Sequence, residues 1–237
     1  MDKRKILFVL TGHDRLGKAN DRDADKTGFH LSEAATPWSI LTEAGFTVDF
    51  ATPAGGKAPI DPSSRDLDDK DNARFLEDDR VKRQIGDTRK LADVTLSEYE
   101  AIYFPGGHGT MWDFPDSDAV KNAVRKMYED GKVVAAVCHG PAAFVNVTMS
   151  DGRWFVQDRR MSAFTDAEEK AVEKDSVMPF LLASRLEERG AKLESADNFE
   201  SSVSIDERLV TGQNPASARG VGEAIRDLVT KRIRKAA

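Results

Sequence analysis

The chain has 237 residues, 40% of them hydrophobic and 32% charged, with a formal net charge of −6 and a pI near 5.4. This length can bury one substantial core, and the acidic balance argues against nucleic acid as a main partner, because phosphate binding needs a basic face. No stretch approaches the roughly 18 apolar residues of a membrane helix, and the basic start lacks a signal-peptide core. We therefore expect one domain spanning residues 1–237, with no membrane contact and a cytoplasmic location.

The predicted elements alternate between strands and helices along the chain. An apolar run at 6–10 is typical of a strand buried on both faces, and it precedes a helix at about 28–44 and a strand at about 46–51. A Pro-, Gly- and Asp-rich surface excursion at about 53–92 contains a charged helix at about 73–92. The remaining predicted elements are strands at 101–104, 133–136, near 160–164 and 209–211, and a last helix at about 216–234.

A recurring glycine punctuation indicates the fold class. Gly45, Gly131 and Gly190 each end a helical pattern and precede an apolar run, where a helix C-terminus favours a left-handed residue. Repeated alternation of this kind is typical of a parallel sheet with helices on both faces. We therefore predict a single-domain α/β fold with a flavodoxin-like, mainly parallel sheet sandwiched by helices.

Cys138 is the only cysteine of the chain and follows the apolar run at 133–137. It stands where a buried strand gives way to a helix, and the free N–H groups of that helix favour a thiolate. Gly140 permits a sharp turn, and Pro141 suits the first turn of a helix. These neighbours favour a nucleophile at a strand-to-helix elbow over the alternative, a buried cysteine that only packs. A lone cysteine also forms no internal disulfide, which suits a reducing compartment.

Other segments that follow predicted strands carry polar groups suited to the same site. Ligands of a doubly wound sheet bind at the carboxyl ends of its strands. The sequence PGGHGT at 105–110 follows one strand, and the N–H groups of Gly106 and Gly107 are candidate donors to a small oxyanion. Glu33 lies in the first helix, where it is either a carboxyl beside the thiol or a solvated helix residue. Spacing alone favours the solvated alternative.

Four segments together resemble the ThiJ/PfpI superfamily. They are PGGHGT at 105–110, AAVCHGP at 135–141, FTD at 164–166 and TGQNPAS at 211–217. Within that superfamily, the cysteine and glycine motifs and the helix around Glu33 resemble the glyoxalase III branch, which includes a heat-shock chaperone and its fungal relatives. The likeness spans most of the chain. It implies a cofactor-free conversion of methylglyoxal to D-lactate, with chaperone and protein-deglycation activities as alternatives.

The resemblance also implies roles for individual residues. Cys138 corresponds to the nucleophile, His139 to the acid/base partner and Glu33 to the carboxyl beside the sulfur. The third acidic residue is Glu169, although Asp166 and Glu168 are close enough in sequence to exchange with it.

The histidines leave further alternatives open. His139 either acts through its side chain or contributes only its backbone N–H, and His108 either lines the pocket with Gly106 and Gly107 or is a solvated loop residue. His13 and His30 lack a tight ligand spacing with acidic partners, so we expect no metal site. Without a histidine beyond His139, an active class I glutamine amidotransferase is excluded.

Several functions and partners remain as predictions. The main prediction is a glyoxalase acting on a small dicarbonyl, without a cofactor, through a hemithioacetal and an enediol. The alternatives are a cysteine peptidase of the same superfamily and a holdase chaperone or deglycase that binds unfolded or glycated protein. The superfamily favours dimers, so we also expect a homodimer.

Overall fold

The computed structural model describes residues 4–18 and 21–236. Strands in this part of the chain are β1 (Lys5–Val9), β2 (Thr47–Thr52), β3 (Arg89–Lys90), β4 (Ala101–Phe104), β5 (Val133–Val137), β6 (Arg160–Met161), β7 (Lys192–Leu193), β8 (Val203–Asp206) and β9 (Leu209–Gly212). The α-helices are α1 (Leu31–Glu43), α2 (Lys70–Glu77), α3 (Asp79–Gly86), α4 (Thr110–Asp113), α5 (Asp118–Glu129), α6 (Asp166–Ala171), α7 (Leu182–Glu188) and α8 (Ala218–Ala236). Short 3₁₀ helices are η1 (Pro62–Ser64), η2 (Leu91–Asp93), η3 (Leu96–Glu98), η4 (Gly140–Phe144) and η5 (Pro215–Ser217).

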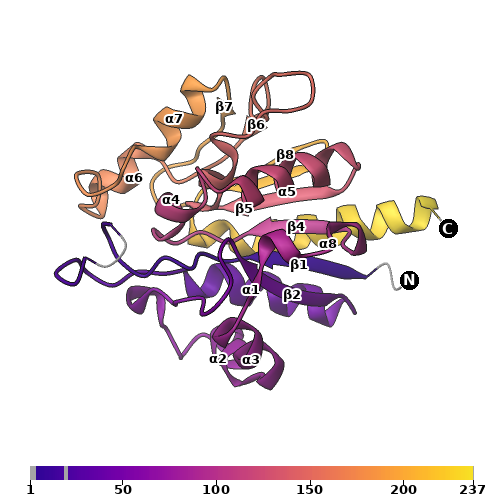
Figure 1. Cartoon of the computed structure of the whole chain (residues 1–237), viewed down its shortest axis with the longest axis horizontal. Helices are drawn as coiled ribbons and strands as arrows, with labels where there is room; N and C mark the ends of the chain where they lie inside the picture. Colours follow the sequence, from indigo (N-terminus) through magenta and orange to yellow (C-terminus); the bar gives the residue numbers. More distant parts are fainter. Residues whose placement is uncertain (1–3, 19–20, 237) are drawn as a thin grey trace.

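A seven-stranded sheet with the order β3-β2-β1-β4-β5-β9-β8 forms the centre of the molecule (Figure 1). Its neighbouring strands are parallel except for β8, which pairs antiparallel with β9. This arrangement confirms the predicted α/β fold with a mainly parallel sheet. Because parallel strands share one direction, the segments that follow β1, β4, β5 and β9 meet at one edge of the sheet.

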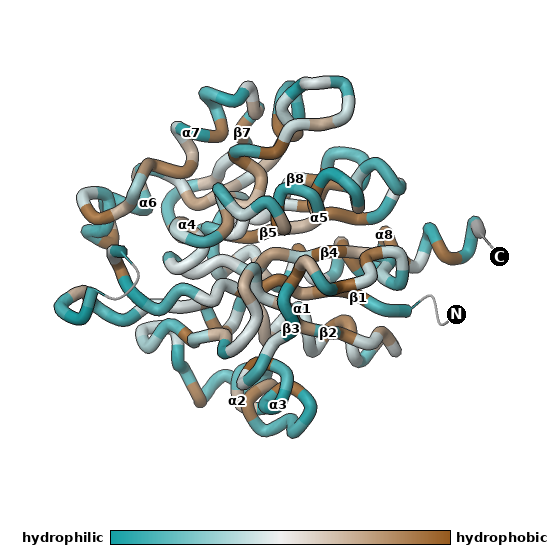
Figure 2. Tube along the Cα trace, viewed as in Figure 1, coloured by the Kyte–Doolittle hydropathy of each residue, from teal (hydrophilic) through white to brown (hydrophobic). Residues whose placement is uncertain are grey.

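Helices cover both faces of the sheet and bury two apolar cores. Helix α5, with α7 and η4, packs on one face, and helices α1, α2 and α8 pack on the other. The central strands alternate their side chains between these cores, so that Leu7 and Val9 face the first while Ile6 and Phe8 face the second. In Figure 2 the hydrophobic residues accordingly concentrate on the central strands and the inner sides of the helices.

Some predicted elements differ from those observed. The charged helix expected at 73–92 is two helices, α2 and α3, separated at Asp78, which ends the first and caps the N-terminus of the second. The strand expected near 160–164 is the two-residue β6, which pairs with β7 outside the main sheet. The helix expected directly after Cys138 is the 3₁₀ helix η4, and the short antiparallel strand β8 was not predicted. The glycines predicted to end helices, Gly45, Gly131 and Gly190, do have positive φ.

Candidate active site

Cys138 lies at a strained turn between β5 and η4. Its φ of 60° is in the left-handed region, which is unfavourable for a residue with a Cβ. Strand β9 and the segment after β6 hold this conformation. The Cys138 N–H donates to the Gly212 carbonyl at 2.9 Å, and the Cys138 carbonyl accepts from the Phe164 N–H at 3.0 Å. Strain of this kind, held by surrounding hydrogen bonds, is typical of a nucleophile elbow.

His139 links the cysteine to Glu169. Its Nδ1 lies 3.3 Å from Cys138 Sγ, and its Nε2 lies 2.6 Å from Glu169 Oε2. A carboxylate only accepts hydrogen bonds, so Nε2 carries the proton and Nδ1 is left as the acceptor that faces the thiol. The three side chains therefore form a nucleophile, a base and an orienting carboxylate in the usual order of a catalytic triad.

The structure separates Glu169 from the two acidic residues that the sequence left as alternatives. Glu168 faces away from the histidine and accepts hydrogen bonds from Asn214 Nδ2 and the Phe199 N–H, both at 2.8 Å. Asp166, the first residue of α6, accepts hydrogen bonds from the backbone N–H and the hydroxyl of Ser184. Only Glu169 of these three contacts His139, so its predicted position in the site is supported by the geometry.

His108 is a second imidazole on the same carboxylate. Its Nε2 lies 2.9 Å from Glu169 Oε1, and its ring lies beside that of His139 with 4.3 Å between the centroids. The side chain is 19% exposed and lines the pocket. His108 is therefore a pocket residue, as one of the two sequence alternatives proposed, and it also holds Glu169 in place.

Glu33 is fully buried on the other side of the cysteine. Its Oε2 accepts the Gly106 N–H at 2.7 Å, while Oε1 has no hydrogen-bond partner among the described nitrogen and oxygen atoms and lies 3.9 Å from His30 Nδ1. The alternative of a solvated helix residue is therefore wrong. The turn of α1 that carries Glu33 points toward the sheet, because Leu31, Ala34 and Ala35 pack in the same core.

Gly106 has a different role from the one predicted. Since its N–H already donates to Glu33, it is not available to an oxyanion. A Cβ at this position would lie 2.6 Å from the backbone nitrogen of His139 and 2.8 Å from Glu33 Oε2, so no larger residue fits. Gly106 thus lets the backbone approach Glu33 and holds its carboxyl beside the elbow.

Gly107 and His139 retain the N–H groups expected of an oxyanion site. No oxygen among the described residues accepts either N–H group, and both residues line the pocket. The His139 N–H faces the Cys138 sulfur. An oxygen on a carbon bonded to that sulfur would lie near these donors.

The environments of the two carboxyls shift their pKa values in opposite directions. Burial raises the pKa of Glu33 to about 8, against the opposing effect of the Cys138 and Gly106 hydrogen bonds. Burial also disfavours the ionised form of Glu169, but His139 and His108 outweigh it and lower its pKa to about 2. At neutral pH Glu33 therefore keeps its proton and Glu169 is ionised, which separates an acid from a charge-stabilising group.

Cys138 is a thiol rather than a preformed thiolate at neutral pH. Burial raises the pKa of Cys138 well above its usual value, and the neighbouring Glu33 raises it further. The prediction that helix N–H groups lower this pKa is wrong, because burial and Glu33 outweigh the lowering effect of the His139 N–H. Burial also lowers the pKa of His139, so its imidazole is neutral and able to take the thiol proton.

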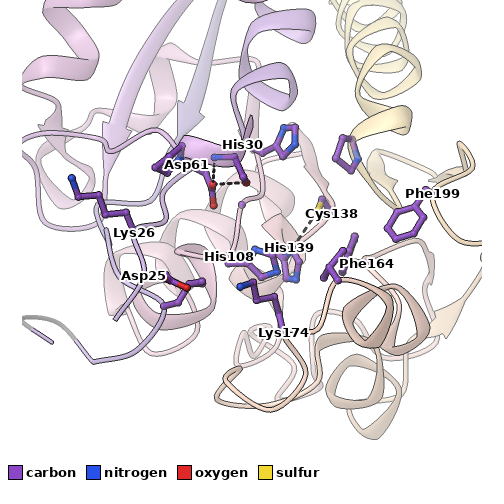
Figure 3. A pocket seen from close by; sticks show the side chains of 16 residues that line it. Asp25, Lys26, His30, Asp61, His108, Cys138, His139, Phe164, Lys174 and Phe199 are labelled. Atoms are coloured by element: carbon purple, nitrogen blue, oxygen red, sulfur yellow. Dashed lines mark hydrogen bonds between the residues drawn. The ribbon is translucent and has the colours of Figure 1, made fainter. Parts of the chain in front are cut away.

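A cavity of about 740 Å³ opens onto this site, and Cys138, His139 and His108 are among the residues that line it (Figure 3). Its walls include residues that the sequence analysis did not assign to the site. His30 precedes α1 and its pKa falls to about 4 through burial, so it is neutral. Asp61 comes from the excursion at 53–92 and is held by Thr27 Oγ1 at 2.8 Å. His30 lies three residues before Glu33, a spacing that could have indicated that the two side chains are neighbours. No sequence pattern indicated that Asp61 lies at the same cavity.

Comparison with known proteins places this geometry in a family. The profile described as the DJ-1/PfpI family matches residues 25–227. The chain belongs to the DJ-1/PfpI family. This confirms the resemblance stated from the sequence motifs.

Relatives in this family match most of the chain. It is 32% identical over 228 residues to the glutathione-independent glyoxalase HSP31 of Saccharomyces cerevisiae, covering 92% of this chain and 94% of the relative. It is 30% identical to the protein/nucleic acid deglycase HchA of Escherichia coli, covering 93% of this chain and 79% of that protein. The crystal structure of the 24 kDa Rapid Encystment Protein of Francisella tularensis superposes with a TM-score of 0.90 at 38% identity, covering 95% and 99% of the two chains. In the DJ-1/PfpI chain described here, no helix of residues 4–18 and 21–236 is both long and apolar enough to cross a membrane.

Proposed function

We propose that this DJ-1/PfpI chain is a glutathione-independent glyoxalase that converts methylglyoxal to D-lactate through a covalent adduct on Cys138. The observation that carries the proposal is the pairing of a Cys138–His139–Glu169 triad with a second carboxyl, Glu33, that is buried and protonated. A triad alone serves acyl transfer, but an isomerisation also needs a group that moves a proton between adjacent carbons. The name of the yeast relative, a glutathione-independent glyoxalase, supports the same activity.

The first step is addition of the thiol to the aldehyde carbon C1. Cys138 Sγ bonds to C1 while His139 Nδ1, at 3.3 Å, takes the thiol proton, so no free thiolate is required beforehand. Glu169 stabilises the imidazolium that forms. The C1 oxyanion lies near the Gly107 and His139 N–H groups and receives the Glu33 proton, which leaves a neutral hemithioacetal and a Glu33 carboxylate.

The second step moves a proton between the two carbons. The Glu33 carboxylate takes the hydrogen of C1 while His139 returns its proton to the C2 oxygen, which gives an enediol. Glu33 then delivers its proton to C2 as His139 takes the proton of the C1 hydroxyl, and the adduct becomes a thioester. A pKa of about 8 suits this exchange, because the group can both release and regain a proton near neutral pH.

Hydrolysis completes the reaction. Water attacks the thioester carbon, the C–S bond breaks, and His139 gives its proton to the leaving sulfur. The water gives its hydroxyl to the carbon and its remaining proton to the Glu33 carboxylate, so both the protonated carboxyl and the thiol are restored. One carbon is oxidised and its neighbour reduced within the substrate, so the balance needs one water and no redox cofactor.

Replacing Cys138 with serine tests the proposal. We expect kcat/KM for methylglyoxal, measured without glutathione, to fall roughly 10⁴-fold, because the serine hydroxyl is a far poorer nucleophile than the thiol and the triad acts as a unit. Chiral chromatography of the wild-type product should show D-lactate. Since the chain has one cysteine, iodoacetamide provides a matched chemical control at the same atom. Turnover by Cys138→Ser above a tenth of the wild-type value would overturn the covalent mechanism.

Deglycation is a second candidate, favoured by the size of the cavity. At about 740 Å³ it exceeds what a dicarbonyl of five heavy atoms needs, and the apolar rings of Phe164 and Phe199 form one wall. The name of the relative HchA includes a deglycase activity. A methylglyoxal adduct of N-acetylarginine, assayed with a scavenger that removes free methylglyoxal, separates the two functions. Continued turnover supports direct deglycation, and complete suppression supports a glyoxalase alone.

The alternatives of a peptidase and a holdase make different predictions for Cys138. The residue lines the cavity and is only 4% exposed, which suits a small aldehyde better than a polypeptide backbone. A holdase that uses a surface patch would continue to suppress aggregation in Cys138→Ser, whereas a peptidase would lose activity on peptides.

We also propose that the chain forms a homodimer and works in a reducing cytoplasmic compartment, where its thiol is protected from oxidation. Light scattering should give twice the 26.1 kDa chain mass. A mass of one chain at micromolar concentration would contradict the dimer.

A further inference from the structure

Three metal-binding side chains converge at one wall of the cavity. His108, His139 and Glu169 each offer one ligand atom, and these three atoms lie within 4.8 Å of one another. The two imidazole rings lie side by side, with centroids 4.3 Å apart and planes tilted by 43°, so that both Nε2 edges meet the same carboxylate. The labelled rings of His108 and His139 are adjacent in Figure 3.

We propose that His108, His139 and Glu169 bind a zinc ion that reversibly blocks the reactive cysteine. Two imidazole nitrogens and one carboxylate form a common three-ligand set for zinc, in which the fourth position remains open. In the metal-free arrangement each imidazole points a proton at one oxygen of Glu169. A single zinc ion replaces these two N–H···O hydrogen bonds. The Glu169 carboxylate moves slightly away from the imidazoles, so that each zinc–ligand bond can have its usual length of roughly 2 Å.

Zinc at this position inhibits catalysis because it changes which nitrogen of His139 carries the proton. A neutral imidazole that binds zinc through Nε2 carries its proton on Nδ1. In His139 that is the nitrogen 3.3 Å from Cys138 Sγ, so the bound histidine cannot accept the thiol proton. Glu169 is withdrawn from the imidazole at the same time. No net proton release is required, since each neutral histidine only moves its proton from Nε2 to Nδ1.

Cys138 itself is outside the proposed coordination sphere. Its sulfur faces Nδ1, on the opposite edge of the imidazole from the nitrogen that binds the ion. This distinguishes the site from the usual inhibition of cysteine enzymes, in which the thiolate is a metal ligand. Access comes from the cavity, because His108 is 19% exposed while His139 and Glu169 are nearly covered. The open position therefore faces the space where substrate would bind.

Calorimetric titration of the Cys138→Ala protein with zinc chloride tests the site without relying on turnover. We expect one zinc per chain. Adding His108→Gln or, separately, Glu169→Gln should weaken binding by at least about tenfold, the effect that even the loss of an outer-shell partner produces. Adding His13→Gln is the matched control, because His13 stacks on Trp112 outside the cluster and should leave binding unchanged. Loss of binding in Cys138→Ala, or its retention in both ligand variants, would overturn the proposal.

A cobalt spectrum provides a second measurement on the wild-type chain, where no variant has to fold. Cobalt bound by two histidines and a carboxylate should show ligand-field bands without a thiolate-to-cobalt charge-transfer band, and iodoacetamide treatment should leave the ligand-field bands in place. A thiolate band would contradict the assigned ligands. Because both measurements follow the metal alone, a chain that binds zinc but does not turn over methylglyoxal would refute the proposed function and leave this inference standing.

Discussion

Two buried glutamates at opposite ends of the sheet have contrasting surroundings. Glu100 precedes β4 and is 6% exposed, and its carboxylate pairs with Lys132 Nζ at 2.9 Å and with Arg232. Glu33 lies at the carboxyl ends of the strands and is fully buried, and no lysine or arginine of the described residues pairs with it. Two cations compensate the Glu100 carboxylate, whereas no lysine or arginine of the described residues compensates Glu33.

The contrast teaches how one residue type serves two purposes. A buried carboxylate with paired cations links elements that are distant in sequence, as Glu100, just before β4, is linked to α8. A buried carboxyl without a cation holds its proton at neutral pH and becomes a proton donor. The functional end of the sheet therefore contains the energetically unfavourable features. They are the buried carboxyl of Glu33 without a cation, the left-handed backbone conformation of Cys138, and Gly106, where no side chain fits.

His139→Asn should have the largest effect on turnover among variants that separate the two ends. We expect kcat for methylglyoxal to fall by about 10³-fold, because the base that takes the thiol proton is lost. The matched variant at the other end, Lys132→Gln, should change kcat by less than about twofold. Steady-state assays compare the two, and an equal loss in both variants would show that the site is not confined to the carboxyl edge.

Glu33→Gln should lower activity and also change how stability depends on pH. Turnover should fall about 10²-fold with the loss of the proton carrier. The pKa of Glu33 is raised in the folded state from 4.5 to about 8, so the folded chain binds more protons than the unfolded chain in this window and loses stability as pH rises through it. The variant removes that loss.

Urea unfolding at pH 5 and pH 8 measures this effect. The decrease in unfolding free energy between the two pH values should be smaller in Glu33→Gln than in wild type by about 3 kcal/mol. Taking the difference between the proteins cancels the other groups that titrate in this range. An unchanged pH dependence would mean that Glu33 is ionised in the folded chain.

Glu100→Gln should show the reverse pattern. Removing one partner of a buried ion pair leaves Lys132 without its carboxylate, so we expect a loss of about 3 kcal/mol in stability. Turnover of the folded protein should stay within about twofold of wild type. A large drop in kcat at a temperature where the variant remains folded would contradict the separation of the two ends.

The smallest expected difference in activity is between alanine variants of two glycines, one at each end of the sheet. In Gly106→Ala the new methyl group would lie 2.6 Å from the backbone nitrogen of His139. We therefore expect a loss of about 2 kcal/mol in stability and at least a tenfold loss of kcat. Gly131 has a φ of 71° but no atom within 4 Å of an added Cβ, so Gly131→Ala should cost about 1 kcal/mol and leave kcat unchanged. Equal kinetic effects would refute the close-packing argument at Gly106.

The sequence predicted most of the fold because its signals were local. Continuous apolar runs fix β1, β4 and β5, and the glycines at 45, 131 and 190 end the preceding helices. The break between α2 and α3 was missed, because it depends on the single residue Asp78 serving as cap to both helices. Strand β8 was missed because only Ser204 of its four residues is buried, so it lacks the apolar pattern of a core strand.

The site was predictable in its residue types but not in its electrostatics. The family resemblance grouped Cys138, His139 and Glu33, and the structure brings them together, although spacing alone favoured a solvated Glu33. The raised pKa of Cys138 follows from burial that no motif reveals. Glu168 and Glu169 are neighbours in sequence, yet successive helical residues point about 100° apart, so one clamps Phe199 and Asn214 while the other meets His139.

The protonation of Glu33 at neutral pH is the central claim, and infrared difference spectroscopy measures it directly. The wild-type minus Glu33→Gln spectrum should show the C=O stretch of a protonated carboxylic acid at pH 6, disappearing as the pH rises through about 8. Asp113, whose pKa burial raises to about 7, contributes equally to both proteins and cancels. A difference spectrum that shows only carboxylate bands at pH 6 would contradict the account.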